Sequence, residues 1–587
     1  MNILGLSCFY HDAGACLLRD GHLVAAAEEE RFSRQKHDAR LPLLAANYCL
    51  EAADCDPEDL DYVVFYEKPL LKFERIVAGY AATYPRSRVA FVKAMQTWLG
   101  QKLWVRGQIR DGLGYDGEVL FGEHHLSHAA SAFFPSPFDD AAVLTADGVG
   151  EWASTTLGIG RGIDLELSHE IRYPHSLGLL YSAFTAYLGF EVNEGEYKVM
   201  GMAAYGRPTF VDKVRKLIEL SEDGSYRLDL RYLAYPHALR SIDDPFVELF
   251  GPPRSPGVEL EERFADIAAS IQVVTEEAML GLARRARSLS GSEHLCMAGG
   301  VALNVLANAR ILRESGFKQV WIQPAAGDAG GCLGAATYLY HTVLRQPRQM
   351  RMDTAYLGPC YSNTEIHEFL EREGVGFSVL DDAEIAPTVA RFIADSNVIG
   401  WFQGRMEFGP RALGARSILA NPTDPTTKDT LNAKIKHREA FRPFAPSTLL
   451  EAASTYFEFG SRTGGLESPF MLLTARVRSD KQHLLPAITH VDGTARVQTV
   501  SRAQNPLYYA LIEEFGKLTG VPVLVNTSFN VQGEPIVCTP AEAFNSFAHT
   551  DMDFLVMGDA LVPASSKRKL GAYPGAKLVH AGEEVVV

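Results

Sequence analysis

Residues 3–27 read ILGLSCFYHDAGACLLRDGHLVAAA, and this stretch decides the fold. Its apolar runs are separated by turn signals at Asp12–Gly14 and Asp20–Gly21, because Asp and Gly accept the tight backbone conformations of hairpin turns. We therefore predict a meander of three strands. A similar pattern returns at AAVLTADGVGEWASTTLGIG (residues 141–160), with an acidic, glycine-rich turn between two strands. We interpret it as a weak internal repeat.

Two copies of a strand-turn-strand unit, each followed by helices, indicate two similar α/β lobes that face each other across a cleft. Actin-like and sugar-kinase-like proteins use such lobes, with nucleotide phosphates between the two hairpin turns. Any α/β protein can contain two hairpins, however. From the pattern alone, the two-lobed interpretation and an unrelated α/β fold are about equally supported.

Histidines gather in FGEHHLSHAASAF (residues 121–133), which follows an apolar run and has the pattern of a strand feeding a helix. Residues four apart share one helix face, so His124 and His128 can aim both imidazoles at one metal ion. His125 lies about 100° away and is predicted to point elsewhere. Taken alone, the stretch favours ordinary core or surface histidines on an amphipathic helix.

Oxygen ligands for such a metal come from other strand-to-helix turns. The chain breaks a short strand at Gly299–Gly300, where the backbone can approach a ligand closely, and then repeats the layout around Asp328. Taken singly, Asp328 can be a helix cap and Asp147 a turn former. Together with the histidines they would form a mixed nitrogen and oxygen shell, which suits a catalytic divalent metal: His124, His128, Asp147 and Asp328.

The composition sets the class of protein. The chain has 587 residues, enough for two to four domains, and a net charge of -16 from 56 Lys and Arg against 72 Asp and Glu. This charge argues against a general nucleic-acid or anionic-membrane binder, although local basic patches could still grip phosphates. Eight scattered cysteines without a CxxC spacing, and no visible signal peptide, favour a reducing cytoplasm. Residues 177–190 are weakly polar but too short to span a bilayer.

A domain boundary is predicted near LRQPRQMRM (residues 344–352), which is basic, polar and proline-containing between two apolar blocks. We therefore divide the chain into domains at 1–350 and 351–587. The second domain carries an unusual density of cations in sequence rich in Gly and Pro: Arg405, Arg411, Arg416, Lys436, Arg438 and Arg442.

These cations indicate a built anion pocket, because guanidinium forks match phosphate oxygens. The alternative is a solvated basic face, but the residues show no helical charge periodicity. Arg496 and the turn NTSFNVQGEP (residues 526–535), which follows a strand, could add a guanidinium, hydroxyls and backbone donors.

Several segments resemble one family, the O-carbamoyltransferases that include the nodulation protein, the cephalosporin hydroxymethyl enzyme and the tobramycin enzyme. Each motif alone is weak, but together they are highly specific and extend from residue 3 to about residue 560. They are YHD (10–12), EEERFSRQKHD (28–38), HHLSHA (124–129), DGVGE (147–151), EYKVMG (196–201), AGGVALN (298–304), GDAG (327–330) and EFGPRALGARS (407–417).

The resemblance implies an α/β protein with an actin-like N-terminal domain of ribonuclease-H-like lobes. It also implies a smaller α/β C-terminal domain similar to the threonylcarbamoyl-adenylate synthase fold. In the second domain, carbamoyl phosphate and ATP would give carbamoyl-adenylate and pyrophosphate. The first domain would then transfer the carbamoyl group to a hydroxyl of a small natural product such as an antibiotic, glycoside or alkaloid-like compound.

The same resemblance assigns roles to residues. His11 would be the general base, and the four metal ligands would hold a divalent ion, iron(II). Nucleotide binding is implied for Gly299, Gly300, Asn304 and Gly327. The phosphate-bearing substrate would be held by Lys36, Arg411, Lys436, Arg442, Arg496 and Ser528. No nucleic-acid or membrane partner is expected. The resemblance implies a homodimer.

Two other functions are compatible with parts of the sequence. A sugar-kinase-like phosphotransferase would explain the hairpins, but neither the histidine pair nor the arginine-rich second domain. A non-catalytic nucleotide-binding or metal-binding protein, or a metal-dependent peptidase, would lack carbamoyl chemistry. The products formed from ATP and carbamoyl phosphate separate these possibilities.

Overall fold

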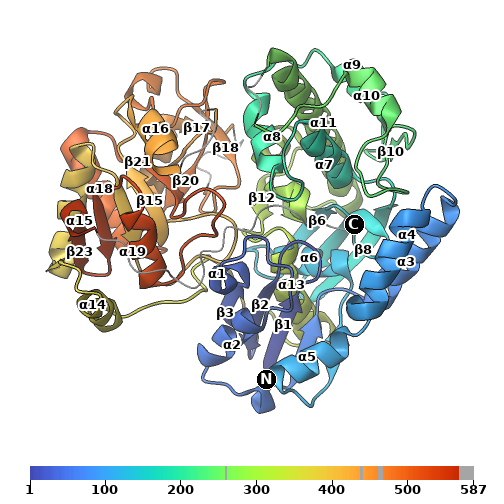
Figure 1. Ribbon diagram of the computed structural model, residues 1–587, viewed down its shortest axis with the longest axis horizontal. Coiled ribbons are helices and arrows are strands. Elements are labelled where there is room, and N and C mark those ends of the chain that lie inside the picture. The colour runs from blue at the N-terminus through green and yellow to red at the C-terminus, as the bar shows by residue number, and fades with distance from the viewer. Residues whose placement is uncertain (258–260, 437–440, 461–466, 568–587) are drawn as a thin grey trace. The chain divides into compact units, whose positions relative to one another are not determined.

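The computed structural model describes residues 1–257, 261–436, 441–460 and 467–567. This part of the chain divides into two compact units, one made of residues 1–29 and 37–352 and the other of residues 30–36 and 353–567 (Figure 1). Residues 30–36 join the second unit because Arg34 donates hydrogen bonds to the carbonyl oxygens of Ile536 and Pro535, at 2.7 and 2.8 Å.

The predicted meander forms the first sheet of the first unit. Its five strands are β1 (Asn2–Ser7), β2 (Gly14–Arg19), β3 (His22–Glu28), β4 (Tyr62–Phe65) and β5 (Val119–Phe121). The first three are antiparallel, and β4 and β5 continue the sheet parallel to β1, in the order β3-β2-β1-β4-β5. Helices α2 (Leu43–Glu51) and α13 (Gly331–Tyr338) pack on this sheet. The close approach of α13 requires Gly5, since a Cβ there would collide with the Cys332 carbonyl.

The second sheet repeats this topology. Its strands are β6 (Asp140–Ala146), β7 (Ala153–Arg161), β8 (Asp164–Arg172), β11 (His294–Ala298) and β12 (Gln319–Ile322). They lie in the order β8-β7-β6-β11-β12, with three antiparallel strands followed by two that are parallel to β6. The internal repeat is therefore confirmed, and its third strand, β8, had not been recognised. Two copies of one sheet confirm the actin-like α/β class of the first unit.

Helices and a short ribbon connect these strands. The helices are α6 (His124–Phe133), α7 (Leu177–Tyr187), α8 (Glu196–Ala203), α9 (Val211–Val214), α10 (Asp244–Phe250), α11 (Glu262–Ser290) and α12 (Val305–Glu314). The ribbon pairs β9 (Ile218–Leu220) with β10 (Tyr226–Leu228). Helices α6 and α11 pack on the second sheet, and α6 also lies against α13. The strand and helix predicted around His124 are thus confirmed.

The first sheet carries a helical insertion that the second lacks. Between β4 and β5 the chain forms α3 (Pro69–Ala82), α4 (Arg88–Thr97), a π-helical turn (Trp98–Lys102) and α5 (Val105–Leu113). The corresponding connection between β11 and β12 holds a short 3-10 turn and α12. The inserted helices have a small core of their own, made of Ile76, Tyr80, Ala90, Ala94 and Trp98.

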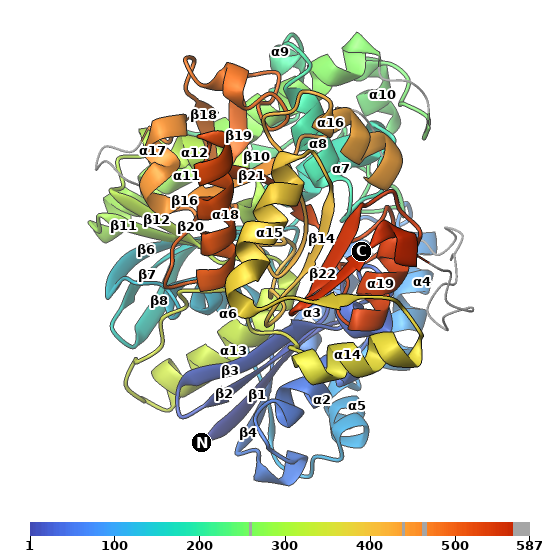
Figure 2. The same cartoon turned by 90° about the vertical axis from the view of Figure 1, so that its left-hand side faces the viewer.

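The second unit is built on an eight-stranded mixed sheet in the order β13-β23-β22-β14-β15-β21-β16-β20 (Figure 2). Its strands are β13 (Ser378–Val379), β14 (Ile399–Phe402), β15 (Arg416–Ala420), β16 (Ala445–Leu449), β20 (Gln498–Val500), β21 (Val523–Ser528), β22 (Phe554–Met557) and β23 (Ala560–Pro563). A separate small sheet contains β17 (Phe457–Glu458), β18 (Thr474–Val477) and β19 (Thr494–Arg496).

Both faces of the large sheet are buried. Trp401 and Phe402, which are successive residues of β14, belong to two different apolar clusters because strand side chains alternate in direction. Helices α15 (Asp382–Ala394) and α18 (Pro506–Thr519) pack together in one cluster. The other helices are α1 (Glu30–Ser33), α14 (Asn363–Arg372), α16 (Thr427–Thr430), α17 (Ala453–Tyr456) and α19 (Pro540–Ala548).

The second unit is thus an α/β structure, as predicted, while its specific likeness to the adenylate-forming synthase fold stays a prediction. Among the described residues, no helix combines the length and apolarity needed to cross a bilayer.

Packing between α6 and α13 gives a test of this fold. A Cβ at Gly334 in α13 would collide with the carbonyl oxygen of Ser127 in α6. We expect Gly334→Ala to destabilise the first unit by about 1–3 kcal/mol, the usual cost of overpacking, and to lower its thermal unfolding midpoint. Gly107→Ala in α5 is the control, because no atom lies within 4 Å of its added methyl group. This control should be neutral or stabilising by up to ~1 kcal/mol. Equal midpoints for the two variants would contradict the packing.

Candidate active site

The candidate site of the first unit lies where parallel strands end. The polar residues that follow these ends are His11 and Asp12 after β1, Tyr66 and Glu67 after β4, His124 after β5, Asp147 after β6, Gly299 and Gly300 after β11, and Asp328 after β12. Because the three strands of each set run parallel, each sheet presents its three ends along one edge. Ligands of α/β proteins commonly bind at such edges.

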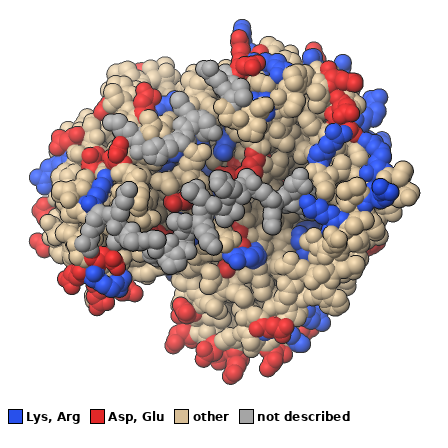
Figure 3. All heavy atoms as spheres, in the orientation of Figure 1, with Lys and Arg blue, Asp and Glu red and all other residues tan. Residues whose placement is uncertain are grey.

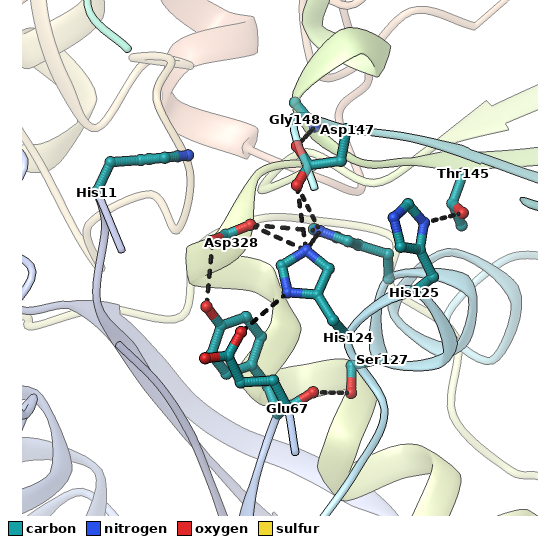
Figure 4. A network of polar contacts seen from close by, with 12 residues as sticks. His11, Glu67, His124, His125, Ser127, Thr145, Asp147, Gly148 and Asp328 are labelled. Carbon is teal, nitrogen blue, oxygen red and sulfur yellow. Dashed lines mark hydrogen bonds and ion pairs between the residues drawn. The ribbon is translucent and has the colours of Figure 1, made fainter. Parts of the chain in front are cut away.

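Four side chains from these ends meet in one cluster (Figure 4). The Nε2 atoms of His124 and His128 lie 3.2 Å apart. Asp147 Oδ2 lies 3.1 Å from the first and 3.8 Å from the second, and Asp328 Oδ1 lies 3.6 and 3.4 Å from them. All the ligand atoms fall within 4.8 Å of one another, and all four residues are buried. The structure therefore brings the predicted metal ligands together.

The cluster has the properties of a metal site. Asp328 Oδ1 is buried and accepts no hydrogen bond from the described residues, although two imidazole nitrogens face it. Burial alone would lower the pKa of His124, but the nearby carboxylates of Asp328, Asp147 and Glu67 raise it to about 10. The imidazoles and carboxylates thus compensate one another's charge while all four residues are buried. Two imidazole nitrogens and two carboxylate oxygens fit a divalent transition metal.

Neighbouring groups hold the four ligands in position. Glu67 Oε2 lies 3.3 Å from His124 Nδ1 and also accepts a hydrogen bond from Lys72 at 2.7 Å. The Tyr66 hydroxyl donates to Asp328 Oδ2 at 3.1 Å, and the Gly300 amide donates to Asp147 Oδ1 at 2.9 Å. A carboxylate on the far nitrogen of a histidine fixes its ring and leaves the other nitrogen for a metal.

His125 faces away from the cluster, as the helical spacing predicts. Its Nδ1 lies 2.7 Å from the Thr145 hydroxyl, and its ring is turned toward Thr145 and not toward Asp147 and Asp328 (Figure 4). Burial, together with the neighbouring imidazoles, lowers the pKa of His125 to about 3. His125 is therefore a neutral, hydrogen-bonded core residue.

His11 stands beside the cluster and points its ring toward it (Figure 4). Its Nδ1 lies 2.9 Å from Asp12 Oδ2, and the other oxygen of Asp12 lies 2.9 Å from His37 Nδ1. Burial lowers the pKa of His11, but Asp12, Asp328 and Asp147 outweigh it and raise the pKa to about 10. His11 is thus protonated at neutral pH while the carboxylates keep their full charge. Positive charge held in the cluster would offset the part of this upward shift that Asp328 and Asp147 cause, and so favour the neutral imidazole that a general base requires.

The residues predicted to bind nucleotide have mixed surroundings. Gly299 has φ of +92° and approaches the Ala146 carbonyl, so a side chain is excluded there. The Gly300 amide is already bonded to Asp147. Asn304 caps α12 and exchanges two hydrogen bonds of 3.0 Å with Gln272. A Cβ on Gly327 would lie 3.9 Å from Asp12 Oδ2. Their role in nucleotide binding stays a prediction.

The predicted anion-binding residues of the second unit share one edge of its sheet. Strands β15 and β16 are antiparallel to β21, and β20 is parallel to β16. The starts of β15, β16 and β20 therefore lie at the same edge as the end of β21. The predicted residues at this edge are Arg411 before β15, Arg442 before β16, Arg496 before β20 and Ser528 at the end of β21. All four are half-buried.

Lys436 lies at this edge. Its ammonium donates to the carbonyl oxygen of Ser528, to the carbonyl oxygen of Asn530 at 2.8 Å and to Asn530 Oδ1 at 2.9 Å. The segment that contains the half-buried Lys36 reaches the same region, because Arg31 donates to the Gly409 carbonyl at 2.9 Å. The structure thus joins Lys436 to Ser528 at the end of β21, while Arg411, Arg442 and Arg496 precede strands that start at the same edge; a shared anion site of the six residues stays a prediction.

Two of the predicted cations have a structural task. Arg416 is fully buried and donates to the carbonyl oxygens of Gln403, Gly404, Ala415 and Pro359, so it holds loops together. Arg405 donates to the carbonyl oxygens of Leu357 and Gly358. Their assignment to the anion pocket stays a prediction, since Lys436 also donates to carbonyl oxygens. Arg438 lies outside the described residues.

Sequence reasoning missed several residues of both sites. Glu67 and Lys72 support the candidate metal ligands, and Asp12 and His37 support His11. Glu67 carried a usable signal, since it follows an apolar strand just as His124 does. In the second unit Glu407 was missed; its Oε1 accepts hydrogen bonds from three backbone amides of the arginine-rich loop.

Comparisons with known proteins agree across the whole chain. Two family profiles match, "Carbamoyltransferase N-terminus" over residues 2–337 and "Carbamoyltransferase C-terminus" over residues 390–563. An uncharacterised protein of Synechocystis is 50% identical over 95% of both chains. The nodulation protein NolNO of Sinorhizobium fredii is 40% identical over 94% of this chain and 79% of its own. The nodulation protein U of Rhizobium tropici is 29% identical over 91% of both.

Substitution of neighbouring histidines tests the metal site. We expect His128→Ala to lose iron(II), because it removes one of four ligands, whereas His125→Ala should keep it. The loss should exceed the about 10- to 100-fold cost of removing a partner that only orients a ligand, such as Glu67→Gln. Anaerobic titration calorimetry and metal analysis after gel filtration measure the affinity, and circular dichroism checks folding. If His128→Ala kept the metal, or if a folded His125→Ala lost it, the assignment of the metal site to the helix face of His124 and His128 would be wrong.

Proposed function

Because the chain belongs to the carbamoyltransferase family, we propose that it is an ATP-dependent O-carbamoyltransferase that works in two half-reactions. The second unit forms carbamoyl-adenylate from carbamoyl phosphate and ATP. The first unit transfers the carbamoyl group to a hydroxyl of a small acceptor, with release of AMP. The observation that carries the proposal is the buried cluster of His124, His128, Asp147 and Asp328 beside His11.

The first half-reaction consumes water. Carbamoyl phosphate loses its phosphate to water, and an oxygen of the resulting carbamate attacks the α-phosphorus of ATP, so that pyrophosphate leaves. Both substrates are polyanions, and the cations at the end of β21 support their binding there: Lys36, Arg411, Lys436, Arg442 and Arg496. Ser528 adds a hydroxyl at the same edge.

In the second half-reaction the acceptor hydroxyl gives its proton to His11 Nε2, since Nδ1 is held by Asp12. The acceptor oxygen forms a bond to the carbamoyl carbon while the bond from that carbon to the adenylate oxygen breaks. His124, His128, Asp147 and Asp328 would hold a divalent cation, iron(II). When bound, this cation supplies Lewis acidity for the negative charge that develops on phosphate and carbamoyl oxygens.

The nature of the acceptor follows from the relatives only as a class. Relatives of this chain are named as nodulation proteins, which supports a hydroxylated natural product as acceptor. A sugar-kinase-like phosphotransferase is the second candidate, favoured by the duplicated sheets alone. It leaves the two histidines and the cationic sheet edge without a role.

Product analysis distinguishes the two functions. The full chain is incubated with ATP, carbamoyl phosphate and iron(II), and the nucleotides are separated by ion-exchange chromatography. We expect pyrophosphate that depends on carbamoyl phosphate, because the α-phosphorus is attacked, and AMP once an acceptor hydroxyl is added. Formation of ADP that depends on a sugar would instead identify a kinase, and no turnover with any tested phosphoryl acceptor would identify a binding protein.

Two variants should separate the half-reactions. Lys436→Met removes a charged donor from the anion pocket, so carbamoyl-phosphate-dependent pyrophosphate release should fall about 10- to 100-fold. His11→Asn should keep pyrophosphate release but abolish incorporation of carbamoyl carbon-14 into a panel of hydroxylated glycosides. Unfolding midpoints close to that of the parent protein exclude misfolding. Loss of both activities in His11→Asn would refute the division of labour.

A further inference from the structure

The helical insertion of the first unit exposes large apolar side chains. Leu70 is 72% exposed, Tyr84 71%, Val89 67% and Trp104 62%, and Val92 and Leu99 are more than half exposed. These six residues lie within 35 positions of a chain whose other apolar side chains are mostly buried or scattered. Grouped exposed apolar residues mark interaction surfaces.

These side chains are not the core of the insertion. Ile76, Tyr80, Ala90, Ala94 and Trp98 already form that core between the helices. In α4, the exposed Val89 and Val92 are three residues apart and alternate with the buried Ala90 and Ala94, so the helix is apolar on two faces. The exposed apolar residues of the insertion therefore do not contribute to its core.

The insertion is also basic. Residues 66–118, which connect β4 to β5, contain nine Lys and Arg against five Asp and Glu, within a chain of net charge -16. Arg86, Arg88, Arg106 and Arg110 are exposed, and Arg86 also forms an ion pair with Asp243. Figure 3 shows Lys and Arg gathered on the side of the molecule where Figure 1 labels α3 and α4. The surface thus combines apolar residues with a cationic border.

We propose that this surface, formed by α3, α4 and the turn to α5, docks on an anionic phospholipid bilayer. Leu70, Val89, Val92 and Leu99 would enter the boundary between headgroups and acyl chains. Tyr84 and Trp104 match the amphipathic aromatic residues found at that depth. The surrounding arginines match the negative headgroups.

Other occupants fit less well. A second copy in a two-fold contact would bring the same arginines against each other. Nucleic acid matches the charge but not the apolar centre. The net charge of -16 argued against an anionic-membrane partner. It is a sum over the whole chain, however, and does not show the local excess of positive charge in the insertion. Docking in the interface needs no spanning helix.

Vesicle binding tests the proposal with the full-length protein. We expect co-sedimentation with phosphatidylcholine vesicles that contain phosphatidylglycerol, and little with pure phosphatidylcholine. Binding should weaken as salt is raised, because exposed charges are screened. Arg88→Glu combined with Arg106→Glu should lower the partition coefficient by more than about fivefold for each cation lost. Val89→Glu combined with Trp104→Glu should lower it further.

Val491→Glu combined with Leu518→Glu is the matched control, since both residues are exposed at 57% and 54% but lie in the second unit. This control should bind like the parent protein, and unfolding midpoints verify that every variant is folded. Equal binding to neutral vesicles, no binding to anionic ones, or patch variants that bind like the control would overturn the proposal. A parent dimer that Val89→Glu dissociates, measured by light scattering, would assign the surface to a second copy.

Discussion

Asp147 and Asp328 place two carboxylates in a space closed to water, beside the imidazoles of His124 and His128, and much of the first unit serves to compensate their charge. An unpaired buried carboxylate is costly, so each receives a donor from a different element: the Gly300 amide for one and the Tyr66 hydroxyl for the other. The imidazoles are supplied by α6, which α13 holds in place. A cation with open coordination positions would complete this balance and make it useful for chemistry.

In the second unit the charged groups are cations, and they also need partners of opposite polarity. Its guanidinium and ammonium groups gather where three strands begin and one ends, and buried Arg416 shows that the same residue type also holds loops there. An arginine that holds loops together and one that binds an anion differ in their hydrogen-bond acceptors. Arg416 donates to four backbone carbonyl oxygens. The arginine-rich loop therefore has a structural role beside its predicted anion binding, and Glu407 accepts hydrogen bonds from its backbone amides.

Duplication of one sheet explains how the two halves of the first unit differ. The same strand order supplies three carboxyl ends from each sheet, but only the first sheet carries the long insertion between its parallel strands. That connection starts directly after the end of β4, where Lys72 of α3 donates to Glu67, and it also has its own apolar core. Its outward-facing residues could therefore change without disturbing the residues at the strand ends.

Local sequence determined the three strands of the first meander, the first two of the second, the helix that carries His124 and His128, and the different direction of His125, because period and turn chemistry act over a few residues. It also indicated the metal ligands as a set. Tertiary structure alone decided that Glu67, Asp12 and His37 support these groups and that Arg405 and Arg416 bind carbonyl oxygens. It likewise decided that residues 30–36 join the second unit. Those outcomes depend on contacts between residues tens to hundreds of positions apart, which no short-range pattern records.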